Sequence, residues 1–405
     1  MKKNIYIINQ HYYPELASTG QVFQEIAEYF AGLDYKVTVI AGKAFYHDEK
    51  MIKPLPRELS GVIIVRLWNT AFKKSFFLGK AFNLLTFQAS LALYSLFCLH
   101  RDSFVMVGTN PPLALLSLII AKKIRCFKLI SVIQDLYPDI LVCSGFTNER
   151  AFLFRFLRRI VKNSFKACDR IVTISEDMRN HMEKIYTVAE VKVINNMVIG
   201  DIYPKPSVNN RNTFDTCKEF LVMYSGNFGI AHEYETLHET VRLLAENESI
   251  LFKIVGGGIH YNSLKKACIR ESLRNISFFP YTVKEDLNTS LNEADVHLII
   301  FDNEFKNVLM PSKYYGILAC GKPIILISSG ENVISRDIVS YDIGFTVANN
   351  EPFRLRDILI KLSQEPETLI AMGQRARMLY MEKYRRELVL EKYKGIIDSF
   401  NLGQL

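Results

Sequence analysis

The chain has 405 residues, of which 49% are hydrophobic and 23% are charged, and it carries a net charge of +8. This composition is typical of globular proteins and excludes a disordered tail, a collagen and a coiled coil. The length predicts two or three domains of roughly 150 residues each. The seven cysteines are scattered without a C-x-x-C pair, which argues against a disulfide framework and a structural zinc site.

Positive charge is concentrated in the first half of the chain. Residues 1–200 hold 26 Lys and Arg against 16 Asp and Glu, whereas the remainder holds 24 against 26. This asymmetry indicates an anionic partner, either nucleic acid or an anionic membrane surface, or else a basic solvated face with no partner. The first residues read as a short strand rather than a signal peptide, so we expect a cytoplasmic location.

Strands and helices alternate along the first half. Strands are expected at 5–9, 37–41, 62–67, 104–108, 129–134, 170–174 and 191–194. Helices are expected at 19–32, 81–99, 113–124, 151–167 and 176–185. Such alternation with short connections predicts a parallel, doubly wound sheet.

Two of these helices raise the question of a membrane. Residues 81–100 contain no charged side chain and are long enough to span a bilayer. However, Asn83, Thr86 and Ser90 fall on one helical face, which favours a buried or surface-lying helix over a span. Residues 152–166 interleave apolar side chains with five Lys and Arg residues. That composition is typical of an interfacial membrane helix, or of an ordinary amphipathic surface helix.

The alternation restarts in the second half. Strands are expected at 220–225, 251–255, 276–279, 296–300, 323–327 and 344–347, and helices at 233–246, 262–272, 284–293, 312–320 and 353–363. Pro204, Pro206 and a run of polar residues mark a linker at 201–216. We therefore predict an α/β protein with two Rossmann-like, doubly wound domains, residues 1–200 and 217–380, followed by a C-terminal helix within 381–405.

Ligands of doubly wound sheets bind beyond the carboxyl ends of the strands, so candidate site residues are sought there. In the first half, His11, Glu15, Thr19 and Gly20 follow the first strand. Gly20 would let the backbone approach a ligand, and free amides at the start of a helix attract phosphate. A plain strand–turn–helix cap is the alternative.

A second candidate follows the strand at 129–134, where the chain reads Asp135-Leu136-Tyr137-Pro138-Asp139. A carboxylate at the carboxyl end of a parallel strand suits base chemistry or hydroxyl binding. Asp135 and Asp139 are therefore candidates, and turn formation is the alternative for both.

Three candidates lie in the second half. Ser225, Gly226 and Asn227 form a polar loop of low bulk that suits a diphosphate, and the glycines at 256–258 form either a similar loop or a plain turn. Pro311, Ser312 and Lys313 open a predicted helix. There the helix dipole, a hydroxyl and an ammonium group converge, as phosphate binding requires.

The segments HYYPELASTG, YSGNFG, VGGG and MPSKYYGILACGKPII, in this order, resemble family 4 glycosyltransferases of the GT-B fold. The subgroup resembled makes bacterial O-antigen, capsule and exopolysaccharide. The resemblance covers essentially the whole chain and implies two facing domains. It also implies a nucleotide sugar, expected to carry UDP, on the C-terminal domain, an acceptor on the N-terminal domain, and retention of the anomeric configuration. The last helix is expected to cross back onto the first domain.

The resemblance also implies roles for individual residues. Asp135, beside the acceptor hydroxyl, and Lys313, on the donor diphosphate, are the expected catalytic residues. The expected donor ligands are Gly20, Ser225, Gly226, Asn227, Gly256, Gly258, Pro311, Ser312 and Lys313. The expected acceptor ligands are His11, Glu15, Thr19 and Asp139.

The chain departs from the common pattern of the family. Asn227 and His232 stand where many members have an Arg and a Lys, and Val308 and Gly316 replace the E-x7-E pair. The donor contacts are therefore expected to differ from those of such members.

Negative charge builds on the diphosphate as the glycosidic bond breaks, and Lys313 with loop amides can stabilise it without a metal. No cofactor is expected, and Asp302-Asn303-Glu304 is the nearest imitation of a D-x-D metal pair. The expected partners are a nucleotide sugar, a polyprenyl-diphosphate-linked acceptor and the anionic inner face of the plasma membrane, but not nucleic acid, for which no motif is present. A nucleotide-sugar epimerase of similar fold and a catalytically silent membrane scaffold are the alternatives.

Overall fold

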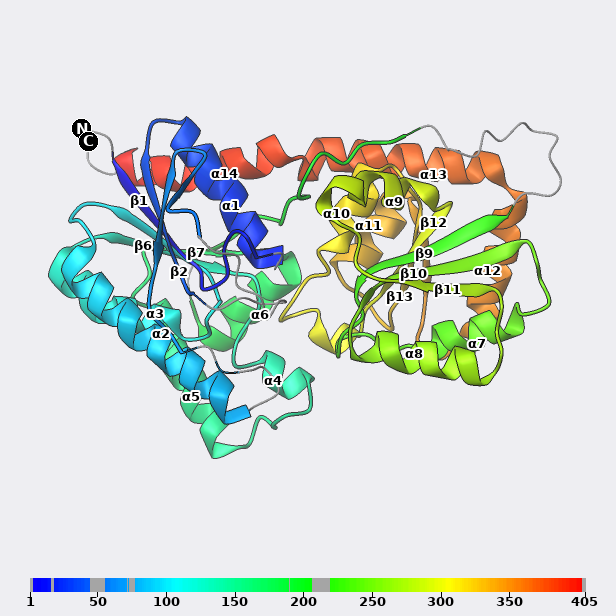
Figure 1. Ribbon diagram of the computed structural model, residues 1–405, viewed down its shortest axis with the longest axis horizontal. Coiled ribbons are helices and arrows are strands. Elements are labelled where there is room, and N and C mark those ends of the chain that lie inside the picture. The colour runs from blue at the N-terminus through cyan, green and yellow to red at the C-terminus, as the bar shows by residue number, and fades with distance from the viewer. Residues whose placement is uncertain are drawn as a thin grey trace. The chain divides into compact units, whose positions relative to one another are not determined.

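The computed structural model describes residues 3–15, 18–43, 55–70, 72, 77–188, 190–205 and 219–402. The chain divides into two units (Figure 1). The N-terminal unit consists of Met1–Asn195, Asn307–Met310 and Glu387–Leu405, and the C-terminal unit of Asn196–Lys306 and Pro311–Arg386. Residues 206–216 of the predicted linker lie outside the described residues. The preceding residues Tyr203 and Lys205 donate backbone hydrogen bonds to the amide oxygens of Asn288 and Asn292.

The sheet of the N-terminal unit has the strand order β3-β4-β2-β1-β5-β6-β7-β8. Its strands are β1 (Asn4–Ile8), β2 (Lys36–Ala41), β3 (Glu58–Leu59), β4 (Val62–Arg66), β5 (Phe104–Val107), β6 (Lys128–Ile133), β7 (Arg170–Thr173) and β8 (Val191–Val193). Neighbouring strands are parallel apart from the short β3, which pairs antiparallel with β4. The central strands are apolar on both sides, as expected for a parallel sheet covered by helices.

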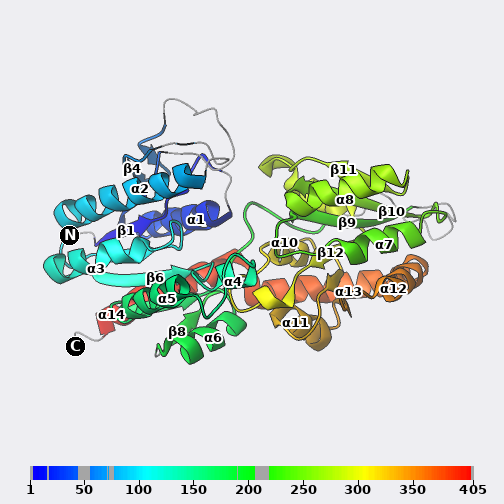
Figure 2. The same ribbon diagram turned by 90° about the horizontal axis from the view of Figure 1, so that it is seen from below.

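The helices of this unit are α1 (Ser18–Gly32), α2 (Phe77–Cys98), α3 (Ala114–Arg125), α4 (Ile140–Cys143), α5 (Phe152–Phe165), α6 (Glu176–Tyr186) and α14 (Arg386–Leu402). The chain steps one way along the sheet from β1 to β2, and the other way through β5, β6, β7 and β8. Because parallel crossovers are right-handed, α2, α3, α5 and α6 must lie on one face of the sheet and α1 on the opposite face. Figures 1 and 2 show α2, α3 and α5 together on their face of the sheet.

The C-terminal unit has the strand order β11-β10-β9-β12-β13-β14, and all pairs are parallel. Its strands are β9 (Phe220–Asn227), β10 (Ile250–Gly257), β11 (Ile276–Phe279), β12 (Val296–Ile300), β13 (Ile324–Ile327) and β14 (Gly344–Val347). The helices are α7 (Glu235–Leu243), α8 (Ile259–Arg270), α9 (Leu287–Glu293), α10 (Lys313–Ala319), α11 (Val333–Tyr341), α12 (Pro352–Gln364) and α13 (Pro366–Leu379). Three short turns complete it: η1 (Lys284–Asp286), η2 (Asn303–Phe305) and the π-helical η3 (Tyr380–Tyr384).

The predicted fold class, two parallel α/β units, is confirmed. Strands β9 and β10 run about two residues past their predicted ends, because Gly226 and Asn227 still pair with Gly256 and Gly257. The helix α11 was not predicted. Its start is fixed by a capping box in which the Asn332 side chain accepts from the backbone of Ser335, where the usual pattern has Glu or Gln.

The described parts of the chain contain no helix that is both long enough and apolar enough to cross a membrane. The polar side of α2 packs as predicted for a surface helix. Ser90 donates to the Trp68 carbonyl oxygen (2.7 Å), and Asn83 and Thr86 contact the Thr70 hydroxyl.

Candidate active site

Three predicted acceptor ligands lie in the turn after β1 and the start of α1. The His11 Nδ1 and Glu15 Oε2 atoms lie 2.6 Å apart. Glu15 is only 6% exposed, and its other carboxylate oxygen has no hydrogen-bond partner among the described residues. Thr19 Oγ1 accepts from Asn110 Nδ2 at 3.3 Å, which ties this turn to the one after β5. This oxygen could accept a hydrogen bond from an acceptor hydroxyl, and acceptor binding here stays a prediction.

Gly20 is required by packing in the first turn of α1. A Cβ atom at this position would lie 2.9 Å from the His11 carbonyl oxygen. The glycine thus lets the helix pack against the preceding turn. Its expected approach to the transferred sugar is not tested by this contact.

Arg66, at the end of β4, was not singled out from the sequence. One of its terminal nitrogens donates to the Gly42 carbonyl oxygen (3.1 Å) and the other to the Tyr13 carbonyl oxygen. Burial lowers the pKa of Arg66, while the nearby Glu15 and Tyr12 oppose that shift. The guanidinium thus adds a cation to the turn after β1. Its position at the carboxyl end of a parallel strand was the available signal.

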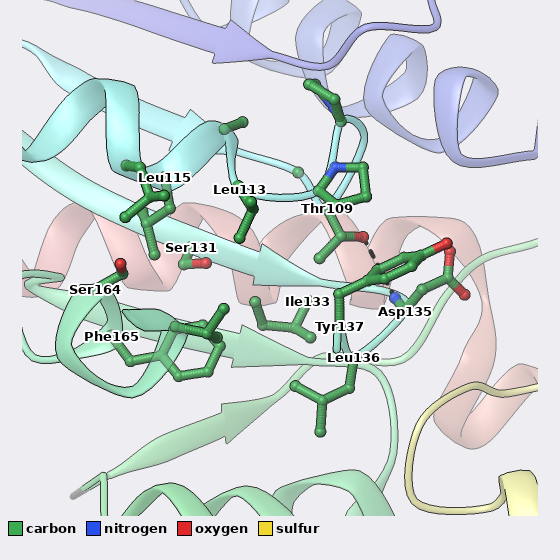
Figure 3. A pocket seen from close by; sticks show the side chains of 16 residues that line it. Thr109, Leu113, Leu115, Ser131, Ile133, Asp135, Leu136, Tyr137, Ser164 and Phe165 are labelled. Carbon is green, nitrogen blue, oxygen red and sulfur yellow. Dashed lines mark hydrogen bonds between the residues drawn. The ribbon is translucent and has the colours of Figure 1, made fainter. Parts of the chain in front are cut away.

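Asp135 lies at the mouth of a small open hollow with a cavity volume of about 40 Å³, which we call the Asp135 hollow. Figure 3 shows Asp135 and Tyr137 at one end of the hollow and Ser164 and Phe165 at the other. The backbone amide of Asp135 donates to Thr109 Oγ1 at 3.3 Å. Burial raises the pKa of Asp135 from 3.8 to about 6. The group is therefore mostly ionised at neutral pH, yet basic enough to accept a proton.

Asp139 is only 4% exposed and is held by three side chains. It accepts from Arg158 (2.6 Å), from Tyr186 and, at Oδ1, from His181 Nε2 (3.0 Å). Burial alone would raise the pKa of Asp139, but these hydrogen bonds and the Arg158 charge lower it below 3.8. The carboxylate therefore ties α5 to α6, which is a structural role, and its expected contact with an acceptor stays a prediction.

In the C-terminal unit, Lys313 is the first residue of α10. Its Nζ atom lies 3.6 Å from the centre of the Tyr224 ring and is buried, without a hydrogen-bond partner among the described residues. Burial lowers the pKa of Lys313 well below its ordinary value of 10.5. A buried amine without a hydrogen-bond partner is costly, and such a position is a candidate for binding an anion. The contact of Lys313 with a donor diphosphate stays a prediction.

Gly226 borders this lysine. A Cβ atom on Gly226 would lie 3.1 Å from Lys313 Cε. His232 lies nearby. Its pKa is lowered to about 3, mainly by burial and also by the charge of Lys313. The imidazole is therefore neutral at physiological pH. This chain therefore has an uncharged side chain at the position where many members of the resembled family have a Lys.

The VGGG turn packs directly on the loop after β9. A Cβ atom on Gly256 would lie 2.1 Å from the Gly226 carbonyl oxygen, and one on Gly258 would lie 2.4 Å from that of Phe228. Both glycines also have left-handed φ angles, of +134° and +121°. They therefore make the turn and hold the Ser225–Asn227 loop in place, and a donor contact at either stays a prediction.

Gly256→Ala is expected to destabilise the chain by more than 3 kcal/mol, since the strained φ alone costs roughly 1–3 kcal/mol and the backbone clash adds to it. Gly32→Ala is the matched control, because a Cβ there meets no atom within 4 Å. Urea unfolding of both variants measures the difference. Equal urea midpoints for the two variants would show that the turn accommodates the added Cβ atom without loss of stability.

The remaining donor candidates make fewer contacts. Pro311 is buried and Ser312 is exposed, and the Ser312 side chain makes no capping hydrogen bond to α10. Asn227 Oδ1 accepts from the Tyr281 hydroxyl at 3.3 Å, and Ser225 lies opposite Val255 in the sheet. Their contacts with a donor stay predictions.

The described side chains contain no group of three or more His, Cys, Asp and Glu residues that could hold a metal ion. Asp302 of the D-x-D-like segment caps η2 by accepting from the Glu304 amide. The Val308 carbonyl, at the first position of the missing E-x7-E pair, accepts from the Leu136 amide at 2.8 Å.

Two sequence families match consecutive parts of the chain. Residues 19–199 match the family described as Glycosyltransferase Family 4, and residues 209–378 match Glycosyl transferases group 1. The chain belongs to the family 4 glycosyltransferases. It is 25% identical to a probable glycosyltransferase, WbjE of Pseudomonas aeruginosa, over 74% of this chain and 75% of that one.

Two further similarities agree with this family. The glycosyltransferase is 25% identical, over 79% of its own length and 82% of the other, to a putative colanic acid biosynthesis glycosyl transferase, WcaI of Escherichia coli K12. Its fold resembles that of Anabaena HepE, crystallised with UDP and glucose, with a TM-score of 0.69, 15% identity and coverage of 98% and 100% of the two chains. That structure supports the GT-B fold.

Proposed function

We propose that this glycosyltransferase moves a sugar from a UDP-sugar to a polyprenyl-diphosphate-linked saccharide in the synthesis of a bacterial surface polysaccharide. The transfer retains the anomeric configuration and needs no metal. The observation that carries this proposal is the buried Lys313 amine beside the glycine loops, which has no hydrogen-bond partner among the described residues.

The donor half rests on the chemistry of the leaving group. A nucleoside diphosphate gains negative charge as the glycosidic bond breaks. Lys313 lies against Tyr224 and Gly226, where a protonated amine would interact strongly with that charge because water is largely excluded. The bound UDP in the structure of HepE supports a uridine nucleotide. Lys313 is proposed to take up a proton as the diphosphate binds.

The acceptor half rests on Asp135. Its carboxylate is ionised at neutral pH and lies at the mouth of a hollow, where it can orient a sugar hydroxyl. In a retaining transfer the donor phosphate can take the proton of that hydroxyl, with Asp135 as an orienting group or auxiliary base. The name of WcaI, which refers to colanic acid, supports a surface polysaccharide as the product.

A nucleotide screen followed by product analysis tests the proposal. UDP is expected to raise the melting temperature more than GDP or dTDP, with about 2.7 kcal/mol of stabilisation at a hundredfold excess over Kd. With a UDP-sugar and a polyprenyl-diphosphate saccharide, NMR of the product should show the anomeric configuration of the donor, with or without EDTA. Release of an epimer without an acceptor would instead support an epimerase, and no response to any nucleotide would support a scaffold.

A further inference from the structure

Three helices of the N-terminal unit form one layer with an apolar outer surface. The helices α2, α3 and α5 cover the same face of the sheet (Figures 1 and 2). Large apolar side chains on all three are more than half exposed: Phe82, Leu85, Leu93 and Phe97 on α2, Ile120 and Ile124 on α3, and Phe152, Leu153 and Phe156 on α5. We call this set the three-helix surface. Exposed apolar side chains on three helices of one layer indicate an interaction site when they form a patch.

The arrangement of α2 shows that its exposed stripe is separate from its packing faces. Leu85, Leu93 and Phe97 are 62%, 61% and 72% exposed, and with Phe82 they follow helical spacing along one side. Phe87 and Leu91 are fully buried on another side. The polar side of the helix is occupied by the hydrogen bonds to residues 68–70. The stripe thus faces outward; among the described residues, Phe72 lies against its first member, with the rings of Phe72 and Phe82 6.1 Å apart.

The same three helices carry charge of only one sign. Their sequences contain eight Lys and Arg residues and no Asp or Glu. On the opposite face of the sheet, α1 contains two Glu and no Lys or Arg. The neighbouring α6, beyond α5 on the same face, carries both signs. Positive charge that is not accompanied by acidic residues on the same helix is therefore found on the helices that expose the apolar side chains, whereas α6 and α14 carry both signs.

We propose that the three-helix surface docks this glycosyltransferase on an anionic lipid bilayer. Exposed apolar side chains beside all-basic charge suit the boundary between anionic headgroups and acyl chains. Arg155 and Arg159 are exposed on α5 and meet the headgroups, whereas the uncharged stripe of α2 enters the acyl region. Nucleic acids bind proteins mainly through contacts between phosphates and basic side chains, and the uncharged stripe of α2 offers none.

The surface is built from the same helices as the candidate acceptor site. Leu115 of α3 and Phe165 of α5 line the hollow at whose mouth Asp135 lies (Figure 3). Docking through these helices would bring Asp135 to acceptors that stay anchored in the bilayer. This consequence rests on the proposed function, whereas the docking itself does not.

Flotation of the full chain with vesicles tests the docking. The chain should float with vesicles of phosphatidylcholine and phosphatidylglycerol in equal parts, and much less with phosphatidylcholine alone. Leu85→Glu with Phe97→Glu, and separately Arg155→Glu with Arg159→Glu, should each lower the bound fraction by at least about tenfold. Val339→Glu, at a 75% exposed side chain of the C-terminal unit, is the matched control and should float like the unaltered chain.

Two further measurements separate the possible failures. Circular dichroism and the thermal shift with UDP should be unchanged in all variants, so that loss of flotation is not loss of folding or of donor binding. The proposal would be overturned if the unaltered chain failed to float, or if the α2 and α5 variants floated as well as the unaltered chain. A second outcome would also overturn it. The chain would be a dimer that does not bind vesicles, and Leu85→Glu with Phe97→Glu would make it monomeric. In that case a second copy of the chain, and not a bilayer, covers the three-helix surface. Flotation without any response to nucleotides would leave docking intact and remove the proposed function.

Discussion

Lys313→Met is expected to lower kcat/KM for sugar transfer by about 10²–10³-fold, the range for loss of one preorganised charge-stabilising group. The variant should fold at least as stably as the unaltered chain, because methionine fills the space over Tyr224 without a buried amine that lacks a partner. Initial rates with donor and acceptor varied, together with urea unfolding, measure both effects. A loss of activity with gained stability would identify Lys313 as functional.

The pH dependence of stability gives an independent check on Lys313. Its pKa is lowered in the folded chain, so between that lowered value and 10.5 the unfolded chain binds more protons. Stability of the unaltered chain should therefore gain a rising component with pH in this window, which Lys313→Met should lack. Lys265→Ala, at an exposed lysine of α8, is the control and should change neither activity nor this slope. Unchanged kinetics in Lys313→Met would remove the lysine from the donor site.

Asp135→Asn is expected to lower the transfer rate by about 10²-fold, at the low end for a positioned acid–base group. In the unaltered enzyme the rate should fall as the pH drops below about 6, because the carboxylate becomes protonated. The asparagine variant should lose this inflection. Between pH 3.8 and about 6 the folded chain binds more protons than the unfolded chain, because the pKa of Asp135 is raised. The contribution of Asp135 to the free energy of unfolding therefore falls as the pH rises through this window. Asp135→Asn should therefore be more stable at pH 7.

Asp139→Asn is the control for Asp135, four residues away. This carboxylate is bound by Arg158, His181 and Tyr186, and its pKa is lowered. Its replacement should cost stability above pH 4 and leave the inflection near pH 6 in place. The roles would be reversed if Asp139→Asn removed that inflection and Asp135→Asn did not.

The parallel sheets were predictable because buried strands of Val, Ile and Phe are local signals, separated by helices of clear periodicity. The α11 helix was missed because its start depends on Asn332 and Ser335 capping each other, a pairing outside the usual pattern. The two short elements β3 and α4 were missed as well, since two or four residues carry no period.

The sequence predicted the positions of the candidate residues relative to the strands better than the contacts of their side chains. Asp135 and Asp139 both follow β6, yet sequence position could not distinguish Asp135, at an open hollow, from Asp139, inside a closed network. Nor could it show that Gly256 and Gly258 face backbone oxygens. Arg66 was missed because its partners Gly42 and Tyr13 lie in the loops after other strands, β2 and β1.

Neither unit is a continuous stretch of chain, since the N-terminal unit takes its last helix from residues beyond 386. Within that unit Phe400 packs on Phe104, and the Tyr29 hydroxyl donates to Glu391. A fragment ending near residue 200 would therefore expose the surface against which α14 packs, and it is a poor candidate for separate expression. Placing α14 ahead of β1 through a flexible linker would restore that helix, and this rearranged order is the rational way to obtain most of the N-terminal unit alone.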